Sequence, residues 1–254
     1  MGVIRYAAAC VQGDARRNNE DNIYCNGFYL PEQNHGMEQI REGSIGTGGS
    51  LIAVFDGMGG ESAGETAAYL AAKSLAGQQK GLAGFGSKIT ARLQPETAVR
   101  NLCDGMNRQI CCHARDHRIR SMGTTVAGLL IAGRRITGFN LGDSRIYCMA
   151  GGKMTQISED HNEKTIIRRK TPLTQFLGIP EDVMQLQPYS TGRELRSGER
   201  YLLCTDGLTD VMEEEEIARI MMDEETPARI VQRLLHEVEA QGAVDNTSII
   251  AVET

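Results

Sequence analysis

The sequence predicts an α+β fold, in which strands follow strands and the helices are grouped apart from them. Between residues 124 and 157, four short apolar or alternating runs succeed one another with only a few turn residues between them, which is typical of an antiparallel meander. No crossover helix fits into those gaps, so parallel pairing is disfavoured. Two helical patterns precede the meander and a third follows it. We therefore expect a layered α+β domain and not an alternating parallel α/β domain.

Eight segments are expected to be strands, because each is a short apolar or alternating run. They are residues 3–11, 51–55, 124–131, 135–140, 144–149, 153–157, 200–205 and 247–252. Helical patterns occupy 61–79, which is rich in alanine, 95–116, and the segment that follows Thr226-Pro227 and ends near Gly242. The glycine-rich segment 77–87 is expected to be a mobile loop.

Length, charge and cysteine usage limit the classes of protein that fit. The chain has 254 residues, of which 41% are hydrophobic and 24% are charged, as in one soluble globular domain. Its net charge of −6 disfavours a general nucleic-acid or membrane-surface binder. No apolar run approaches the roughly 20 residues that span a bilayer, and the N-terminus does not resemble a signal peptide.

The seven cysteines include no CxxC pair, which indicates reduced thiols and a cytoplasmic location. Three of them lie in apolar strand-like runs and are expected in the core: Cys10, Cys148 and Cys204. A zinc site is disfavoured for a further group, because its spacing fits no standard zinc pattern: Cys111, Cys112, His113 and His117.

Two Asp-Gly pairs directly follow apolar runs, Asp56-Gly57 and Asp206-Gly207. Asp-Gly is a common hairpin turn, but no second strand follows either pair. A glycine-rich turn and the alanine-rich helix follow the first pair, and an acidic, helix-like segment 208–217 follows the second. Each aspartate is therefore expected at a strand end, where side chains converge on a shared edge. Asp245, just before the strand expected at 247–252, is a third carboxylate of this kind.

Three carboxylates at strand ends, without a matching cluster of histidines or cysteines, suit a hard metal ion such as magnesium or manganese. A cation would also offset the mutual repulsion of the carboxylates, which otherwise raises their pKa values. Near the N-terminus, Arg16 would supply a fork-shaped phosphate ligand, and Glu20 and Asp21 could hold metal-bound waters.

Seven short segments, in one order, carry a resemblance to a known family. They are Arg16 with NED (19–21), VFDGMGG (54–60) with GE (64–65), GTT (123–125), NLGDSR (140–145), DH (160–161), TDGL (205–208) and DN (245–246). Together they resemble the metal-dependent protein phosphatases, the type 2C serine/threonine family, over nearly the whole chain. The version with Met58 resembles the bacterial branch. Each segment alone is a weak signal, but their number and order are highly specific.

The resemblance implies a four-layer α/β/β/α sandwich of two packed antiparallel sheets flanked by helices, with residues 1–254 as a single catalytic domain. It also implies two Mn²⁺ or Mg²⁺ ions bridged by Asp56, with further ligands on the protein and two acidic groups acting through water. These are the Gly57 carbonyl, Asp206 and Asp245 as direct ligands, and Glu20 and Asp21 through water. Asp143 is interpreted as a structural residue of a turn and not as a ligand.

The implied reaction is the hydrolysis of phosphoserine and phosphothreonine in proteins, which would oppose a serine/threonine kinase. Arg16 would hold the phosphate while a metal-bridging hydroxide attacks phosphorus in line. Two other interpretations stay open at this point. One is a catalytically silent phosphoprotein-binding module on the same fold, which is disfavoured because the metal-binding aspartates and Arg16 are all present. The other is an enzyme that acts on a small phosphate ester.

The chain departs from the family pattern in three places. Eukaryotic relatives have a histidine, a candidate general acid, where this chain has Met58, and methionine cannot donate a proton. A third metal site that relatives often have uses an acidic residue shortly before the GTT segment, where this chain has Arg118 and Arg120. The flap segment around 160–178 is short, and its basic run 168–170 is interpreted as a solvated turn in preference to a docking site for acidic peptides.

Overall fold

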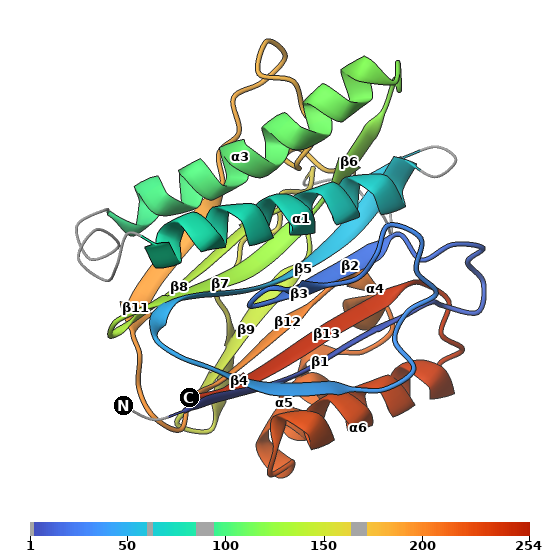
Figure 1. Ribbon diagram of the computed structural model, residues 1–254. Helices are drawn as coiled ribbons and strands as arrows, with labels where there is room; N and C mark the ends of the chain where they lie inside the picture. Colours follow the sequence, from blue (N-terminus) through green and yellow to red (C-terminus); the bar gives the residue numbers. More distant parts are fainter. Residues whose placement is uncertain (1–2, 60–62, 85–93, 164–171) are drawn as a thin grey trace.

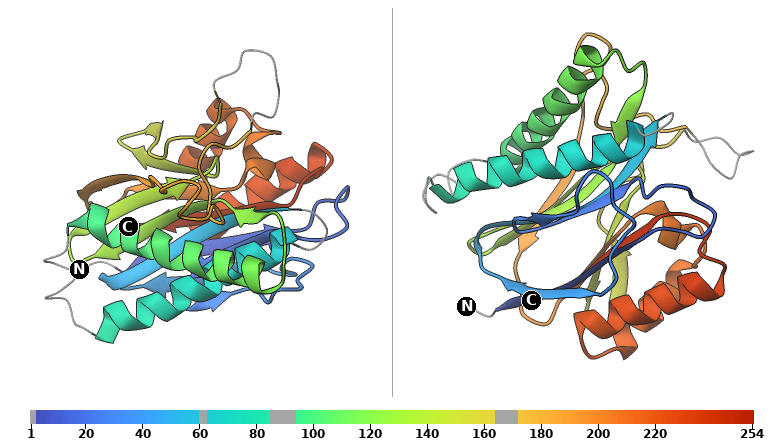
Figure 2. Two further views of the ribbon diagram at one scale, coloured as in Figure 1. Left: turned by 90° about the horizontal axis from the view of Figure 1, so that it is seen from above. Right: turned by 45° about the vertical axis from the view of Figure 1, so that its right-hand side comes forward.

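The computed structural model describes residues 3–59, 63–84, 94–163 and 172–254, and it shows two antiparallel sheets packed face to face with helices on both outer faces (Figure 1). The right-hand view in Figure 2 shows the same four layers, with one pair of long helices above the sheets and the C-terminal helices below them. The predicted α/β/β/α sandwich is therefore confirmed.

The first sheet has six strands and contains both ends of the described chain. Its order is β10 (Lys153–Gln156), β9 (Arg145–Ala150), β12 (Arg200–Cys204), β13 (Thr247–Glu253), β1 (Ile4–Val11) and β4 (Arg41–Ile45). The second sheet has the order β11 (Tyr189–Glu194), β8 (Arg135–Leu141), β7 (Val126–Ala132), β5 (Gly48–Gly59), β2 (Asp21–Cys25) and β3 (Phe28–Tyr29), and β6 (Met122–Thr124) pairs with the end of β5. All eight predicted strand segments are present.

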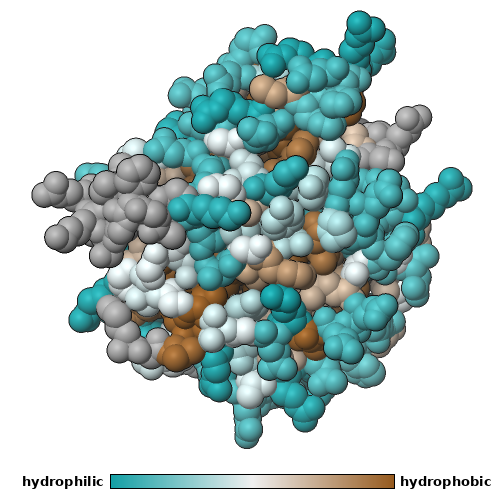
Figure 3. Space-filling model, in the orientation of Figure 1, coloured by the Kyte–Doolittle hydropathy of each residue, from teal (hydrophilic) through white to brown (hydrophobic). Residues whose placement is uncertain are grey.

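Side-chain alternation along the strands builds three hydrophobic layers between the four structural layers. In β5, Leu51, Ala53 and Phe55 pack against α1 (Ala63–Gly84) and α3 (Pro95–Asp116), whereas Ile52 and Val54 face the other sheet. The outer face of the first sheet packs against three helices, α4 (Asp206–Thr209), α5 (Glu214–Asp223) and α6 (Pro227–Ala240). Figure 3 shows that the outer surface over α3 is mostly hydrophilic.

The structure corrects one prediction and adds five strands. The loop expected at 77–87 is wrong for its first part, because α1 continues through Gly77 to Gly84, and residues 85–87 lie outside the described residues. Five strands were not expected from the sequence: β2, β3, β4, β6 and β11. Three of them, β3, β4 and β11, are at sheet edges, where side chains are partly exposed and the hydrophobic pattern is weak.

The burial of three cysteines agrees with the expectation from the sequence. All seven cysteines are free thiols, and Cys10, Cys148 and Cys204 are buried. No helix in the described part of the chain is long and apolar enough to cross a membrane. The basic run 168–170 of the short flap lies outside the described residues.

Candidate metal centre

The three aspartates that were expected at strand ends meet at one end of the space between the two sheets. Asp206 is the first residue of α4, two residues after the end of β12, and Asp245 lies just before β13. Asp56 is the exception to the expectation, because it lies inside β5 and not at its end. β5 continues through Gly59 because its last three residues pair with β6.

Strand register places a second carboxylate opposite Asp56. In the antiparallel pair of β2 and β5, Asp21 is the direct partner of Asp56. Asp21 is buried, and its Oδ2 accepts a hydrogen bond at 2.8 Å from the hydroxyl of Thr205, which directly follows β12 of the other sheet. Burial raises the pKa of the Asp21 carboxyl, and repulsion from Asp206 and Asp245 adds to this effect. Asp21 therefore ties the two sheets together beneath the site.

The glycines of both Asp-Gly pairs are explained by backbone contacts. A Cβ on Gly57 would lie 2.2 Å from the carbonyl oxygen of Gly64, and a Cβ on Gly207 would lie 2.1 Å from the carbonyl oxygen of Asn246. No side chain fits at such distances. The glycines therefore allow the segments that carry the site to approach one another closely.

A pocket of ≈460 Å³ opens at this end of the sheets. It is lined by seven carboxylates, two arginines and eight other residues: Glu20, Asp56, Asp143, Asp160, Asp206, Asp210, Asp245, Arg16, Arg145, Gly57, Met58, Gly59, Thr125, Asn162, Leu173, Thr209 and Asn246. All of the predicted site residues line it except Asp21, which is buried beneath. Asp143 stands in the turn between β8 and β9, as expected, but it also lines the pocket and raises the pKa of Asp56 by repulsion.

The N-terminal loop is held over the pocket by polar contacts with the segment before β13. Arg16 Nη2 donates to Asp245 Oδ2 at 2.6 Å, and its side chain is 43% exposed. Asn246 Oδ1 accepts from the backbone N–H of Glu20 at 2.9 Å, and Asn246 Nδ2 donates to the carbonyl of Asn18 at 3.1 Å. The sequence pointed to Asn246 only as part of a motif, and this bridging role was not predicted.

The backbone of Asp56 is fixed by two consecutive threonines. The Asp56 carbonyl accepts hydrogen bonds from the Thr125 N–H and the Thr124 hydroxyl, both at 2.9 Å. The Asp56 N–H donates to Thr125 Oγ1 at 3.0 Å, and this oxygen lies 2.6 Å from Ser144 Oγ. Because Ser144 follows Asp143, the Thr125 hydroxyl links the backbone of Asp56 to the turn that carries Asp143.

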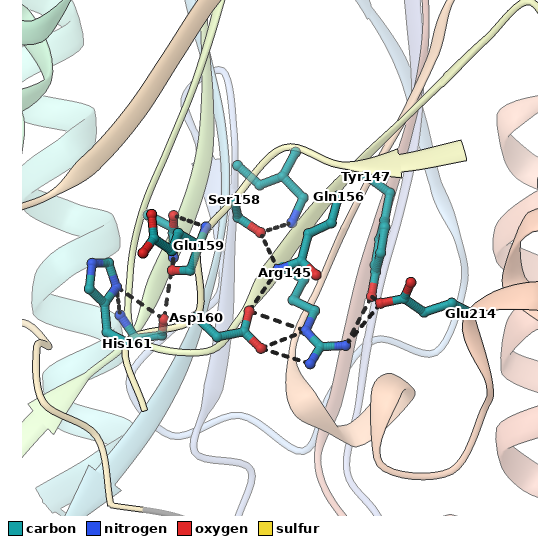
Figure 4. A network of polar contacts seen from close by, with 11 residues as sticks. Arg145, Tyr147, Gln156, Ser158, Glu159, Asp160, His161 and Glu214 are labelled. Carbon is teal, nitrogen blue, oxygen red and sulfur yellow. Dashed lines mark hydrogen bonds and ion pairs between the residues drawn. The ribbon is translucent and has the colours of Figure 1, made fainter. Parts of the chain in front are cut away.

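Arg145 and Asp160 both line the pocket, and Figure 4 shows Arg145 among its polar partners. The guanidinium donates to Asp160 through Nε at 2.9 Å and Nη2 at 2.7 Å, and Nη1 donates to the Tyr147 hydroxyl at 3.2 Å and Glu214 at 3.4 Å. Each of its nitrogens is thus engaged by a neighbour. Arg145 stabilises the wall of the pocket, whereas Arg16 stands at the partly exposed mouth.

The side chains of the pocket fit hard divalent cations. The Asp56 carboxyl hydrogen-bonds that of Asp206, and burial together with repulsion from Asp21, Asp206 and Asp143 raises its pKa well above the usual value. Divalent cations bound by carboxylate and carbonyl oxygens would relieve this repulsion. Within the described ranges, no three acidic, histidine or cysteine side chains already form a closed coordination cluster. The fit therefore rests on the donor set and on its shared pocket.

Comparisons with known proteins identify the family of the chain. The family model described as "Protein phosphatase 2C" matches residues 41–246. The chain is 31% identical over 99% of its length to the serine/threonine protein phosphatase PstP of Mycobacterium tuberculosis, and it spans 45% of that protein. It is 26% identical over 95% of its length to the serine/threonine phosphatase stp of Listeria monocytogenes, of which it spans 92%.

Solved structures extend the likeness to the fold. The catalytic domain of PstP in complex with two manganese ions has a TM-score of 0.74 and 29% identity, and the match covers 99% of this chain and 98% of that one. PppA of Pseudomonas aeruginosa has a TM-score of 0.77 and 25% identity, with 99% and 98% covered. Because the family model matches most of the chain and the solved structures share its fold, the chain belongs to the protein phosphatase 2C family.

Proposed function

We propose that this chain is a metal-dependent serine/threonine protein phosphatase, formed by residues 1–254 as one catalytic domain. The observation that carries the proposal is the pocket in which Arg16 stands above a floor of carboxylates from both sheets. Such a donor set binds two Mn²⁺ or Mg²⁺ ions, and ions of this kind supply a water of lowered pKa as the nucleophile for phosphoryl transfer. The protein's own part is to bind the cations and to orient the phosphate.

Each predicted ligand has a position that suits its role. Asp56 would bridge the ions from the floor of the pocket, and the Gly57 carbonyl, Asp206 and Asp245 would complete the protein ligands. Glu20 lines the pocket and is suited to act through water. Asp21 is buried and bonded to Thr205, so it would act from beneath the site. Asp143 and Asp210 also line the pocket, although the sequence did not mark them as ligands.

The phosphate and the leaving group impose separate requirements. The planar guanidinium of Arg16 can bind two phosphate oxygens at once and so balance the charge that develops on them. Met58 lines the pocket but cannot donate a proton. Among the described residues, no histidine lines the pocket, and His161 Nδ1 lies 3.3 Å from the backbone N of Gly142. Water is therefore the proton donor that we propose for the departing alkoxide.

Substrate and partners follow from the family and are part of the proposal. The substrates would be proteins phosphorylated on serine or threonine, and an opposing kinase in the bacterial cytoplasm would supply them. The silent binding module is disfavoured, because the residues required for metal and phosphate binding converge on one pocket. An enzyme for small phosphate esters has no specific observation in its favour.

The test is hydrolysis of a phosphothreonine peptide by the purified protein with Mn²⁺, with Mn²⁺ and excess chelator, and by Asp206→Asn with Mn²⁺. We expect activity that requires the metal and falls at least about a hundredfold in the variant. Asp223→Asn, at the exposed end of α5, is the matched control and should retain activity. Hydrolysis that persists with chelator, or in Asp206→Asn, would contradict the proposed metal centre.

A further inference from the structure

We propose that Arg118 and Arg120, together called the basic rim, bind an anionic group next to the phosphorylated residue of the substrate. The group would be a carboxylate or a second phosphate two or three residues from the phosphoresidue. This inference rests on the proposed phosphatase function and adds a preference among its substrates. It concerns residues that neither the metal centre nor the phosphate-binding Arg16 uses.

The backbone places the basic rim beside the mouth of the pocket. β6 starts two residues after Arg120 and pairs with Gly57, Met58 and Gly59, all of which line the pocket. Met122 is the direct partner of Gly59, and the carbonyl oxygen of Ser121 lies 3.2 Å from the position of a Cβ on Gly59. Figure 1 shows the same relation, with β6 running from the C-terminal end of α3 to the end of β5. Arg120 is therefore the chain neighbour of a residue that touches the pocket wall.

The two arginines of the rim carry charges that the protein itself does not use. Both are exposed, and within the described ranges neither forms a side-chain hydrogen bond or an ion pair. The ion pair in this segment joins Arg115 and Asp116 at 3.6 Å. The arginines of the pocket differ, because Arg16 is paired with Asp245 and Arg145 with Asp160. The rim guanidiniums are thus available to a ligand.

Charge complementarity selects an anionic ligand. Seven carboxylates and two arginines line the pocket, and the whole chain carries a net charge of −6. An acidic residue beside the substrate phosphate is therefore repelled over much of this surface, even with cations in the pocket. The basic rim offers attraction at the mouth. An extended peptide advances about 3.3–3.6 Å per residue, so a side chain two or three residues from the phosphoresidue starts about 7–11 Å from it. Arg120, two residues beyond the partner of Gly59, lies at a comparable offset along the chain.

The alternative is that the rim is a solvated surface without a ligand, and kinetics can separate the two. We would measure KM and kcat for three phosphothreonine peptides of one length, with neutral flanks, with glutamates two and three residues away, and with a second phosphate at that distance. The protein would carry Arg118→Gln and Arg120→Gln together. The matched control is Arg135→Gln with Arg196→Gln, which removes two exposed arginines at the far end of the second sheet.

The wild type should show a lower KM for the anionic peptides than for the neutral one. The rim variant should reduce this ratio of KM values about five- to thirtyfold, and the control variant should leave it unchanged. The preference should shrink as the salt concentration rises from 0.05 to 0.5 M, because exposed charges are screened. Arg118→Lys with Arg120→Lys should restore most of it. Equal KM values for all three peptides in the wild type, or an unchanged preference in the rim variant, would overturn the inference.

A binding measurement keeps the inference testable apart from turnover. The same three peptides, carrying a fluorophore, would be titrated with protein in Mn²⁺ buffer and followed by anisotropy. Absence of turnover on every peptide and on an aryl phosphate would contradict the proposed phosphatase function. In that case, a higher Kd of the anionic peptides for the rim variant than for the wild type, measured by anisotropy, would still support the basic rim. Equal binding of the neutral and anionic peptides to the wild type would refute the rim alone.

Discussion

Thr125→Val removes the hydroxyl that joins Asp56 to Ser144, and its consequences can be worked out from the contacts. The Asp56 N–H loses its acceptor at 3.0 Å, and the fully buried Ser144 hydroxyl loses its partner at 2.6 Å. A buried polar group without a partner costs about 1–3 kcal/mol. Two such groups, with some relaxation, give an expected loss of about 2–4 kcal/mol in the free energy of unfolding.

The same change should weaken metal binding. The hydroxyl fixes the backbone of Asp56 relative to the turn that carries Asp143, and residues that orient ligands from behind are typically worth a factor of about 10–100 in metal affinity. Urea unfolding measures the stability, and titration calorimetry with Mn²⁺ measures the affinity. Thr125→Ser retains the hydroxyl and should recover most of the affinity.

A buried threonine away from the pocket serves as the control. Thr137 lies in the middle of β8 and is only 3% exposed, so Thr137→Val changes a buried hydroxyl without touching Asp56. It should leave the affinity for Mn²⁺ unchanged. If Thr125→Val lost stability but bound Mn²⁺ as tightly as the wild type, the hydroxyl would be a structural group only, and the reasoning about ligand orientation would fail.

Three further predictions concern packing, the pocket wall and the thiols. Gly207→Ala should lower the free energy of unfolding, measured in urea, by about 2 kcal/mol or more, because the new Cβ meets the backbone of Asn246. Gly77 lies in open space within α1, so Gly77→Ala should raise the free energy of unfolding by about 0.5–1 kcal/mol. Equal effects of the two substitutions would refute the assigned contacts. Arg145→Gln should lower the free energy of unfolding by about 1–3 kcal/mol. Arg145→Lys should recover only part of this loss, because lysine cannot donate through two nitrogens to Asp160 as arginine does. If urea unfolding showed that Arg145→Lys is as stable as the wild type, the contact would not have the importance assigned to it. Burial raises the pKa of the Cys10 thiol to about 12, so this thiol stays protonated at pH 8 and should react with a thiol reagent only after unfolding. The exposed Cys112 should react first. If Cys112→Ser still reacted rapidly at more sites than the half-buried Cys111, this order of reactivity would be refuted.

The fold was predictable where burial leaves a periodic pattern in the sequence. The central strands carry apolar residues on both faces, since each sheet is covered by helices on one side and by the other sheet on the other. β4 and β11 lack that pattern, because they are edge strands with mostly exposed or partly exposed residues. The glycines of 77–84 suggested a loop, but packing of the alanine-rich part of α1 on the second sheet extends the helix past Gly77.

The candidate site was predictable as a set of residue types and motifs, but not as a geometry. Asp-Gly pairs after apolar runs pointed to Asp56 and Asp206, and a position just before an expected strand pointed to Asp245. The N-terminal segment suggested Arg16, Glu20 and Asp21, and the family resemblance gave them specific roles. The pairing of Asp21 with Asp56 depends on β2, which the sequence did not predict. Asp143 and Asp210 enter the pocket because of how the two sheets meet, and contacts between distant segments leave no local pattern.

The close approach of Asp21 and Asp56 is enforced by the hydrophobic layer between the sheets. Directly opposed like charges on neighbouring strands destabilise a sheet by roughly 0.2–1 kcal/mol. A shift of β5 by one residue would separate them, but it would also turn Ile52 and Val54 away from the layer between the sheets. Burial of each such side chain contributes about 1.5–3 kcal/mol, so the two together outweigh the repulsion several times over. Hydrophobic packing thus holds carboxylates together that would otherwise separate, and the proposed cations would bind where this repulsion is concentrated.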